Sequence, residues 1–210
     1  MAAATRQARP GHERLAERDA RAVFHRSSAK LANTITFVRL LTVVPLLWLI
    51  AVEQFTLAFW VMIAAGLSDG LDGLIARHFD GRSELGAILD PLADKTLLNG
   101  IYVALALVTA IPGWLAALVV GRDLLIVLGA IVIRHRNPVY QPRPLLVGKL
   151  NTFAQIVLAV CTLAHLSNYI ELAEQIDALI VGVAVTTLAS GLGYAVQGLR
   201  AVRASEPDPA

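Results

Sequence analysis

The chain has 210 residues, of which 56% are hydrophobic and only 16% are charged. Soluble globular domains carry charge on about a quarter of their residues, so this composition indicates a membrane protein, and its length suits one compact bundle. The net charge of +2 is small, and nothing in its pattern predicts a nucleic acid partner. The single cysteine, Cys161, excludes an intrachain disulfide.

The first thirty residues contain no apolar core, so they do not form a secretory signal peptide. Their arginine content resembles that of a mitochondrial transit segment, but Glu13, Glu17 and Asp19 argue against that interpretation because such segments are poor in acids. We interpret residues 1–30 as a cytoplasmic juxtamembrane segment, partly helical, whose basic side chains lie against anionic headgroups.

Six apolar stretches follow, each close to the length of about 20 residues that a transmembrane helix needs. They predict an all-α fold, an integral membrane bundle of six transmembrane helices preceded by the juxtamembrane helix. The six-helix domain spans residues 31–200, and residues 201–210 form a cytoplasmic tail. The predicted spans are 35–54, 55–75, 91–110, 113–133, 150–169 and 177–199.

Lysine and arginine residues are distributed unevenly between the two sides of this predicted bundle. They occur in the N-terminal segment, in the connections after the second and fourth spans, and after the last span. The other three connections contain none, and the residues there that carry charge are acidic. By the positive-inside rule, both termini and the two basic connections are cytoplasmic.

Four aspartates lie near the predicted cytoplasmic ends of the second and third spans. Asp69 and Asp72 are three residues apart, and Asp90 and Asp94 are four apart, so each pair occupies one helical face. The short connection predicts that the two helices are antiparallel neighbours, which would let the two acidic faces meet. Asp80 and Glu84 are interpreted as ordinary loop residues.

The cost of burying charge suggests what these aspartates do. A carboxylate near the bilayer centre costs about 2.5–3.5 kcal/mol, and mutual repulsion adds to that cost. Arg77 and Lys95 offset part of it, but two cations do not neutralise four anions. Hard carboxylate oxygens suit Mg²⁺ or Mn²⁺, and the lack of His or Cys in the cluster argues against zinc. We therefore expect a site for two divalent ions.

The same stretch reads Asp-x2-Asp-Gly-x2-Ala-Arg-x8-Gly-x3-Asp-x3-Asp between residues 69 and 94. This spacing resembles the signature of the CDP-alcohol phosphotransferase family at every fixed position, and the resemblance extends over residues 31–200. It implies a metal-dependent membrane enzyme that displaces CMP from a CDP-linked lipid with an alcohol.

The resemblance also implies roles for individual residues. It assigns Asp69, Asp72 and Asp90 as metal ligands, and Asp94 as the base that takes a proton from the attacking hydroxyl and also contacts metal. The residues that it places at the CDP-lipid are Asn33, Gly73, Ala76, Arg77, Ser83 and Gly86. "NTITFVR", which begins at Asn33, resembles the family's entry into the first span.

The later spans contain a buried charge and several small residues. Arg122 lies within the fourth span, where a charge should face a cavity or a partner. We expect that it does not simply pair with Asp123, because adjacent helical residues do not share a face. Gly191, Gly193 and Gly198 on the last span predict close helix packing.

Two branches of the family fit the remaining pattern. Gly148, Lys149, Thr152 and Gln155 match a pattern of phosphatidylglycerophosphate synthases, whose acceptor is glycerol 3-phosphate. "LDPLADK", the adjacent arginine and aspartate in the fourth span, and "K-x-NT-x2-Q" resemble the CMP-forming cardiolipin synthases more closely. That branch implies CDP-diacylglycerol as donor and phosphatidylglycerol as acceptor, with Arg122 and Lys149 as candidate acceptor contacts. The products would be cardiolipin and CMP.

The resemblance suggests a homodimer. We expect the protein in the bacterial inner membrane, with the active site on the cytoplasmic side that the positive-inside rule gives to the aspartates. The mitochondrial inner membrane is an alternative location, because CMP-forming cardiolipin synthases also occur there. A divalent-cation carrier would explain the aspartates and the spans, but not Gly73, Ala76, Arg77 and Gly86 at fixed offsets. A non-catalytic scaffold would not explain why Asp94 is present.

Overall fold

The computed structural model of the protein describes residues 42–78, 84–136 and 145–203. For residues 69–78, 84–94, 134–136 and 201–203 it describes the helical backbone alone. A helical segment, Thr42–Ala51, comes first. It is followed by α2 (Phe55–His78), α3 (Glu84–Leu107), α4 (Gly113–Arg136), α5 (Leu146–Leu166) and α6 (Ala173–Arg203).

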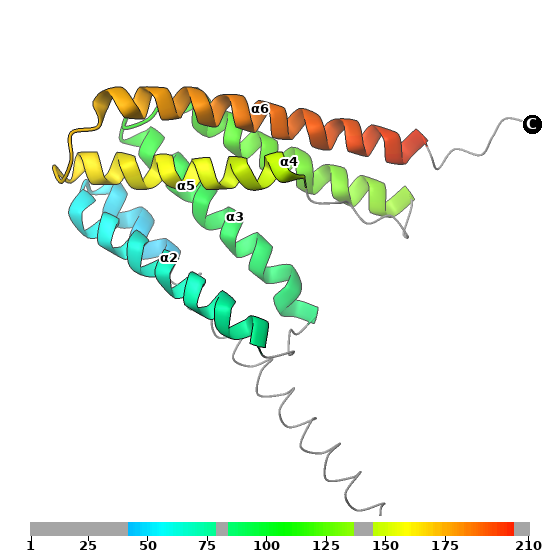
Figure 1. Cartoon of the computed structure of the whole chain (residues 1–210), viewed down its shortest axis with the longest axis horizontal. Coiled ribbons are helices and arrows are strands. Elements are labelled where there is room, and N and C mark those ends of the chain that lie inside the picture. The colour runs from blue at the N-terminus through cyan, green and yellow to red at the C-terminus, as the bar shows by residue number, and fades with distance from the viewer. Residues whose placement is uncertain (1–41, 79–83, 137–144, 204–210) are drawn as a thin grey trace, which may run out of the picture.

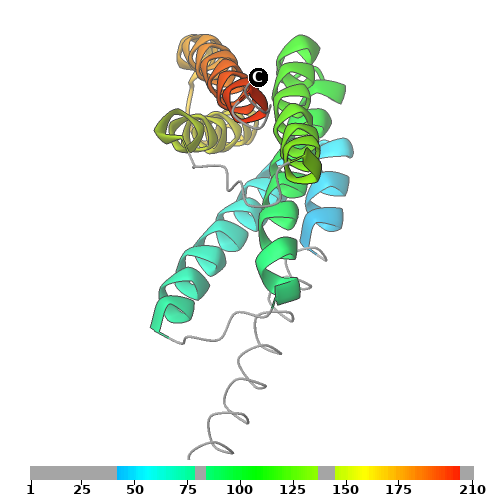
Figure 2. The same cartoon turned by 90° about the vertical axis from the view of Figure 1, so that its right-hand side faces the viewer.

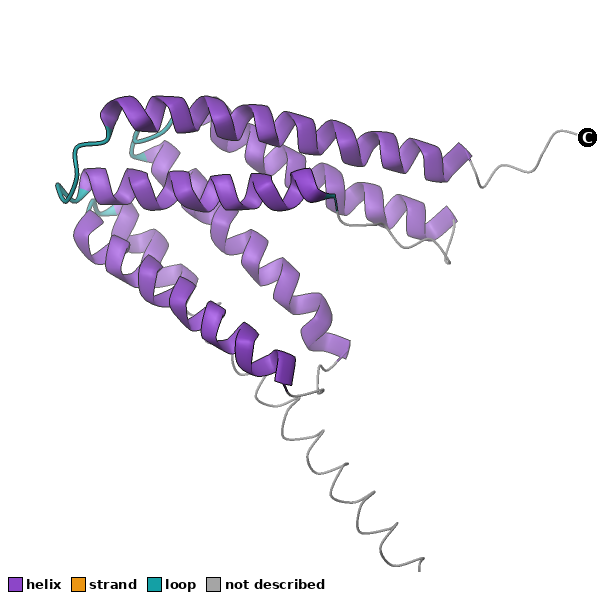
Figure 3. Ribbon diagram, viewed as in Figure 1, coloured by secondary structure: helices purple, strands orange, loops and turns teal. Residues whose placement is uncertain are grey.

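Apart from short connections, the described part of the chain is helical, and no strand occurs in it (Figure 3). Three short connections, 52–54, 108–112 and 167–172, lie at the same end of the bundle (Figure 1). We call this the short-connection end. α6 packs along both α4 and α5, α5 also contacts α2, and α3 contacts α4 and α5. Toward the opposite end, α2 and α3 diverge from the other three helices (Figure 1).

Three helices of the described part are long and apolar enough to cross a membrane, namely Gly113–Ile133, Leu146–Leu166 and Ala173–Arg200. The predicted all-α class is therefore confirmed, and this is an integral membrane protein. Three shorter apolar helices accompany the long ones, at Thr42–Ala51, Phe55–Ser68 and Lys95–Leu107. The count of six transmembrane helices stays a prediction.

Several helices extend beyond the predicted apolar spans. α3 begins at Glu84, so Glu84 is a helical residue and not the loop residue that we expected. α5 begins at Leu146, which places Lys149 in its first turn and not in the preceding connection. α6 begins at Ala173, four residues before the predicted span, and continues to Arg203. A hydropathy pattern locates only the apolar part of each helix, whereas the helical backbone hydrogen bonds extend into the polar residues on either side of it.

The described part of the protein has an apolar surface and also buries several polar side chains. Buried polar side chains include Arg122, Asp123, Asn151 and Gln155, while many large apolar side chains are exposed, such as Leu107 at 79%. A bilayer solvates apolar side chains, and polar ones then turn inward toward each other. A buried apolar cluster around Leu46, Ile101, Tyr102, Leu158 and Val183 joins the Thr42–Ala51 segment to the long helices.

The helices that precede the three short connections end in the same way. Glu53, Thr109 and Asn168 each have a positive φ, at 59°, 57° and 56°. The amide of the residue after each donates to a carbonyl five positions back, as in Tyr169 N to Ala164 O at 3.1 Å. This is the Schellman arrangement, which usually has glycine at the left-handed position.

Thr109→Gly is expected to stabilise the protein by about 1 kcal/mol, because a β-branched residue is strained in the left-handed region. The melting temperature of the purified protein in detergent checks this expectation. Thr162→Gly is the matched contrast, because Thr162 lies within α5 and its hydroxyl donates to Leu158 O at 2.8 Å. A melting temperature that falls for Thr109→Gly would contradict the account of the turn.

Candidate active site

The four aspartates of the signature lie on two helices that run in opposite directions. Asp69 and Asp72 are on α2, and Asp90 and Asp94 are on α3. The C-terminal end of α2 and the N-terminal end of α3 both point away from the short-connection end (Figure 1). The backbone thus carries both pairs to one side of the molecule. Their carboxylates lie outside the described side chains, so the metal site stays a prediction.

The predicted contacts to the CDP-lipid are distributed over the same two helices. Gly73, Ala76 and Arg77 lie on α2, four to eight residues after Asp69. Gly86 lies in the first turn of α3. Asn33 and Ser83 lie outside the described residues.

α2 and α3 do not pack against each other over their described residues. The side chains of the two acidic faces lie outside the described ones, so the meeting of these faces stays a prediction. Figure 2 shows the two helices splayed apart. A cavity of about 470 Å³ lies between them. Its lining is mostly apolar and comes from the Thr42–Ala51 segment and from α2, α3 and α5, including Gly66 and Leu67 just before Asp69, and Leu97 and Leu98 just after Asp94.

A charged network links α3, α4 and α6 directly beyond Asp94. Lys95 Nζ lies 3.1 Å from Asp123 Oδ1, and Arg122 Nη1 lies 2.5 Å from the same oxygen. Asn99 Nδ2 donates to Asp123 Oδ2 at 3.3 Å. Arg122 also donates to Ser190 Oγ, from Nη2 at 2.5 Å and from Nε at 3.2 Å. Both members of the Arg122–Asp123 pair are buried.

The expectation that Arg122 does not pair with Asp123 is therefore wrong. Adjacent residues do point in different directions from a helix, but that rule concerns Cβ positions. The arginine side chain is long enough to bring its guanidinium back beside the neighbouring carboxylate. In an apolar surrounding the attraction between the two charges is strong, which favours this conformation. Lys95, which we expected to offset the aspartates, also has Asp123 as its partner.

Residues on α6 and α5 complete the surroundings of Arg122. The guanidinium carbon lies 5.6 Å from the centroid of the Tyr194 ring, within the range of a cation–π contact. The Tyr194 hydroxyl accepts the Leu145 amide at 3.3 Å, next to the start of α5. Ser190 and Tyr194 were not identified from the sequence. Their spacing of four residues on an apolar helix, like that of Lys95 and Asn99, is the signal that could have found them.

Gly191, Gly193 and Gly198 of α6 lie against neighbouring elements, as predicted. A Cβ atom at Gly193 would come within 2.9 Å of Leu145 Cδ1, and one at Gly198 within 3.2 Å of Ile133 Cδ1. A Cβ at Gly191 would lie 3.7 Å from Arg122 Cγ. Small residues at these positions let α6 approach α4 and the start of α5 closely.

A cavity of about 560 Å³ opens beside Arg122. We call it the basic cavity, because Lys95, Arg122 and Lys149 line it. Its other lining residues are Ile126, Leu145, Gly148, Thr152, Phe153, Ile156 and Tyr194. Three cations with apolar walls suit an anionic group attached to an apolar molecule.

Gly148 keeps the basic cavity open. A Cβ there would lie 3.1 Å from Tyr194 Oη and 3.3 Å from Arg122 Nη2, tighter than ordinary contacts. Gly148→Ala is therefore expected to displace the guanidinium and to raise the KM for an anionic acceptor by about threefold, a modest effect for a binding group shifted but not removed. Initial rates at varied acceptor concentration check this expectation.

Gly129→Ala is the matched control, since a Cβ at that position on α4 meets nothing within 4 Å. It is expected to leave KM unchanged and to raise the melting temperature slightly, because alanine favours helix over glycine. An unchanged KM for Gly148→Ala would mean that the guanidinium position does not matter for acceptor binding.

Asn151 and Gln155, which both belong to the "K-x-NT-x2-Q" pattern, are buried between helices. Asn151 Oδ1 accepts the hydroxyls of Thr186 at 2.9 Å and Thr187 at 2.8 Å. The backbone carbonyl of Gln155 accepts Tyr102 Oη at 3.1 Å. Both residues therefore join α5 to its neighbours, Asn151 to α6 and Gln155 to α3.

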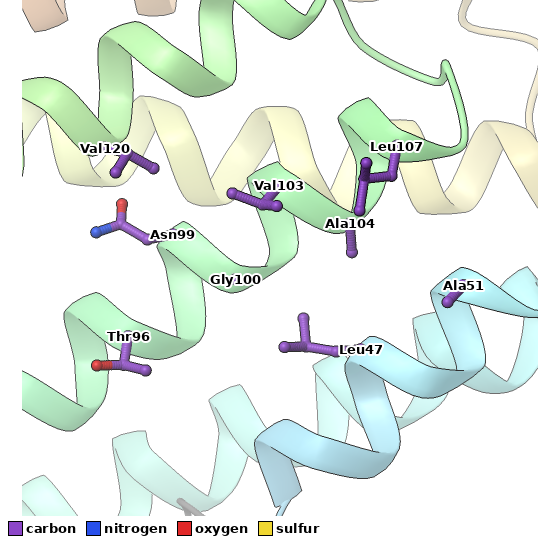
Figure 4. Close-up of a pocket in the computed structure, with 9 residues that line it drawn as sticks. All are labelled: Leu47, Ala51, Thr96, Asn99, Gly100, Val103, Ala104, Leu107 and Val120. Atoms are coloured by element: carbon purple, nitrogen blue, oxygen red, sulfur yellow. The ribbon is translucent and has the colours of Figure 1, made fainter.

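A third cavity, of about 550 Å³, lies between the Thr42–Ala51 segment, α3 and α4. Figure 4 shows Leu47 opposite the α3 face that carries Gly100, with Asn99 toward Val120 of α4. A Cβ at Gly100 would come within 3.0 Å of Leu47 Cδ1. Gly100 thus lets Leu47 lie close against α3.

The comparisons with known proteins agree with the aspartate signature. The model of the family described as CDP-alcohol phosphatidyltransferase matches residues 29–191. The human protein named cardiolipin synthase (CMP-forming) is 33% identical over 190 residues, which cover 82% of this chain and 63% of that protein. The chain therefore spans less than two thirds of the length of this relative.

Bacterial relatives have two different names. The Mycobacterium tuberculosis (strain H37Rv) protein named probable phosphatidylglycerophosphate synthase is 29% identical over 180 residues, covering 82% of this chain and 83% of that protein. The Streptomyces coelicolor protein named cardiolipin synthase (CMP-forming) is 34% identical over 130 residues, covering 59% and 60%. With its family model matched over residues 29–191, this chain belongs to the CDP-alcohol phosphatidyltransferase family.

Proposed function

We propose that the protein transfers a phosphatidyl group from CDP-diacylglycerol to phosphatidylglycerol, giving cardiolipin and CMP. The observation that carries this proposal is the basic cavity, which begins one residue beyond Asp94 and has apolar walls. Phe153 is 66% exposed and Ile156 is 44% exposed, so the cavity wall continues onto the lipid-facing surface. A lipid acceptor with an anionic headgroup suits such a site better than a small water-soluble anion.

The donor lipid fits the other side of the aspartates. The apolar cavity between α2 and α3 lies next to Asp69 and Asp94 along their helices. It has room for part of the diacylglycerol chains when the pyrophosphate lies at the aspartates. Asn33, Gly73, Ala76, Arg77, Ser83 and Gly86 are our proposed contacts to the CDP moiety.

The donor atoms of the aspartate cluster fit divalent cations. Each pair lies on described helical backbone at a spacing of three or four residues, so the two residues of a pair share one face of their helix. Their oxygens are the hard ligands that Mg²⁺ and Mn²⁺ prefer. Two such ions, held by Asp69, Asp72, Asp90 and Asp94, would neutralise the pyrophosphate and make CMP a better leaving group.

The chain's own residues then perform the transfer. The free glycerol hydroxyl of phosphatidylglycerol gives its proton to Asp94 as its oxygen attacks the phosphorus that bears the diacylglycerol. A new P–O bond forms, the P–O bond to CMP breaks, and CMP leaves with the electron pair. Arg122 and Lys149 hold the phosphate of the acceptor and so keep its hydroxyl in place.

The acceptor is tested with the purified full-length protein in detergent, given CDP-diacylglycerol and Mn²⁺. Phosphatidylglycerol and glycerol 3-phosphate are supplied in separate reactions, and the lipid products are identified by mass spectrometry. We expect cardiolipin with phosphatidylglycerol. Product with glycerol 3-phosphate alone would instead support phosphatidylglycerophosphate synthesis, the function in the name of the Mycobacterium tuberculosis relative.

The distribution of lysine and arginine supports a cytoplasmic active site with both termini on the same side. We propose the bacterial inner membrane as the location and a homodimer as the assembly. Residues 31–200 form the catalytic domain in this account, and residues 1–30 the juxtamembrane segment.

A further inference from the structure

Asp123 is the point at which α3 is tied to α4 by polar contacts. Its Oδ1 accepts Lys95 Nζ and Arg122 Nη1, and its Oδ2 accepts Asn99 Nδ2. Two of these donors are on α3, one helical turn apart. Asp123 itself is only 7% exposed, so its carboxylate depends on these donors in place of water.

The location of this tie along α3 matters for the aspartates. Lys95 follows Asp94 directly, and Asp90 is one further turn toward the N-terminus. Figure 1 shows the N-terminal half of α3 diverging from α4 and α6. The contacts of Asp123 therefore lie where the aspartate-bearing turn leaves the packed part of the bundle. Because Lys95 and Asn99 are one turn apart, their two contacts to Asp123 restrict both the rotation of α3 about its axis and its translation along that axis.

We propose that Asp123 is a positioning residue that holds the Asp90–Asp94 turn of α3 in place for divalent cation binding. It touches no reacting atom in this role and acts through Lys95 and Asn99. Groups that orient metal ligands from outside the ligand set commonly change metal affinity by about 10- to 100-fold when they are removed. The catalytic part of this inference rests on the proposed function, whereas cation binding does not.

The contacts of Arg122 predict that acceptor binding is largely kept when Asp123 is substituted. Arg122 has two hydrogen bonds to Ser190 and a ring contact with Tyr194, all on α6. These contacts do not involve Asp123. The guanidinium is therefore expected to stay in the basic cavity, and acceptor binding should change much less than cation binding.

The test measures Mn²⁺ binding to the full-length protein in detergent without substrates, from the electron paramagnetic resonance signal of free Mn²⁺. Asp123→Asn is expected to weaken binding by about 10-fold. Asp123→Glu keeps the charge and is expected to recover most of this loss. Asp177→Asn is the matched control, because Asp177 is an exposed acid near the start of α6, and it should bind Mn²⁺ like the unmodified protein.

Turnover provides the second readout. For Asp123→Asn we expect a lower kcat and a higher Mn²⁺ concentration for half-maximal activity. The KM for phosphatidylglycerol should change less than about twofold, because the substitution displaces metal ligands and leaves the acceptor contacts in place. Normal Mn²⁺ affinity in a folded Asp123→Asn protein would overturn the inference. So would a raised acceptor KM with unchanged Mn²⁺ binding, since that pattern would assign Asp123 to the acceptor.

Lys95→Met and Asn99→Ala keep the inference testable if Asp123→Asn does not fold. Each removes one of the two ties from α3 and leaves Asp123 paired with Arg122. Both are expected to weaken Mn²⁺ binding, and normal affinity in both would overturn the inference. If the unmodified protein binds Mn²⁺ but releases no CMP with either acceptor, the proposed function fails while the Mn²⁺ comparison still decides the role of Asp123.

Discussion

Asp94→Asn is expected to lower kcat by at least about 100-fold, the lower end of the contribution of a general base. Asparagine is close to aspartate in size but takes no proton from a hydroxyl at neutral pH. The melting temperature should change little, because relieving repulsion among the aspartates offsets the lost carboxylate. CMP release at saturating CDP-diacylglycerol, phosphatidylglycerol and Mn²⁺ measures the effect.

Glu84→Gln is the control for this prediction, since Glu84 is an acid of the same stretch to which we assign no role. It should keep normal turnover. Normal turnover in Asp94→Asn would show that another group takes the proton. A loss equal in both variants would point to the net charge of the stretch and not to a specific base.

Arg122→Gln is expected to raise the KM for phosphatidylglycerol by about 10- to 100-fold, because a hydrogen bond to a charged group contributes roughly 1.5–3 kcal/mol. The buried guanidinium lines the basic cavity and is held by Ser190. Lys95 remains to pair with Asp123, so the substitution does not leave that carboxylate without a cation. Initial rates at varied phosphatidylglycerol give KM and kcat separately.

Arg122→Lys keeps the charge but cannot donate to Ser190 from two nitrogens, and we expect an intermediate KM. Arg200→Gln is the control, because Arg200 is an exposed cation near the far end of α6. Mn²⁺ affinity should be nearly normal in Arg122→Gln, the reverse of the pattern for Asp123→Asn. If Arg122→Gln and Asp123→Asn changed KM and Mn²⁺ affinity in the same way, the assignment of Arg122 to acceptor binding and of Asp123 to cation binding would be wrong.

The helices could be predicted because each depends on a local pattern. A run of apolar residues identifies a helix in lipid whatever its neighbours are, so the all-α class and the three short connections followed from the sequence. The helix ends did not, since α3 and α5 continue into polar residues such as Glu84 and Lys149. Hydropathy does not register those turns.

Some residues of the candidate site could likewise be predicted from a local pattern, and others could not. The aspartate signature is contiguous in sequence, so Asp69, Asp72, Asp90 and Asp94 could be predicted as site residues without coordinates, and their roles stay a prediction. The spacing of Ser190 and Tyr194 marks a polar face of α6, but the partner of that face depends on how α6 packs against α4, which no spacing within one helix encodes. Ser190 and Tyr194 were missed for this reason. The pairing of Arg122 with Asp123 does not follow from the Cβ directions of adjacent helical residues, because it depends on the reach of the arginine side chain.

The central claim is that the aspartates serve a phosphatidyl transfer and not the passage of cations. Proteoliposomes that contain the protein, CDP-diacylglycerol and phosphatidylglycerol allow both to be measured in one sample. After Mn²⁺ is added, the account predicts one CMP released for each cardiolipin formed, and none of either when a chelator is present. Mn²⁺ entering the vesicles without any release of CMP would contradict it.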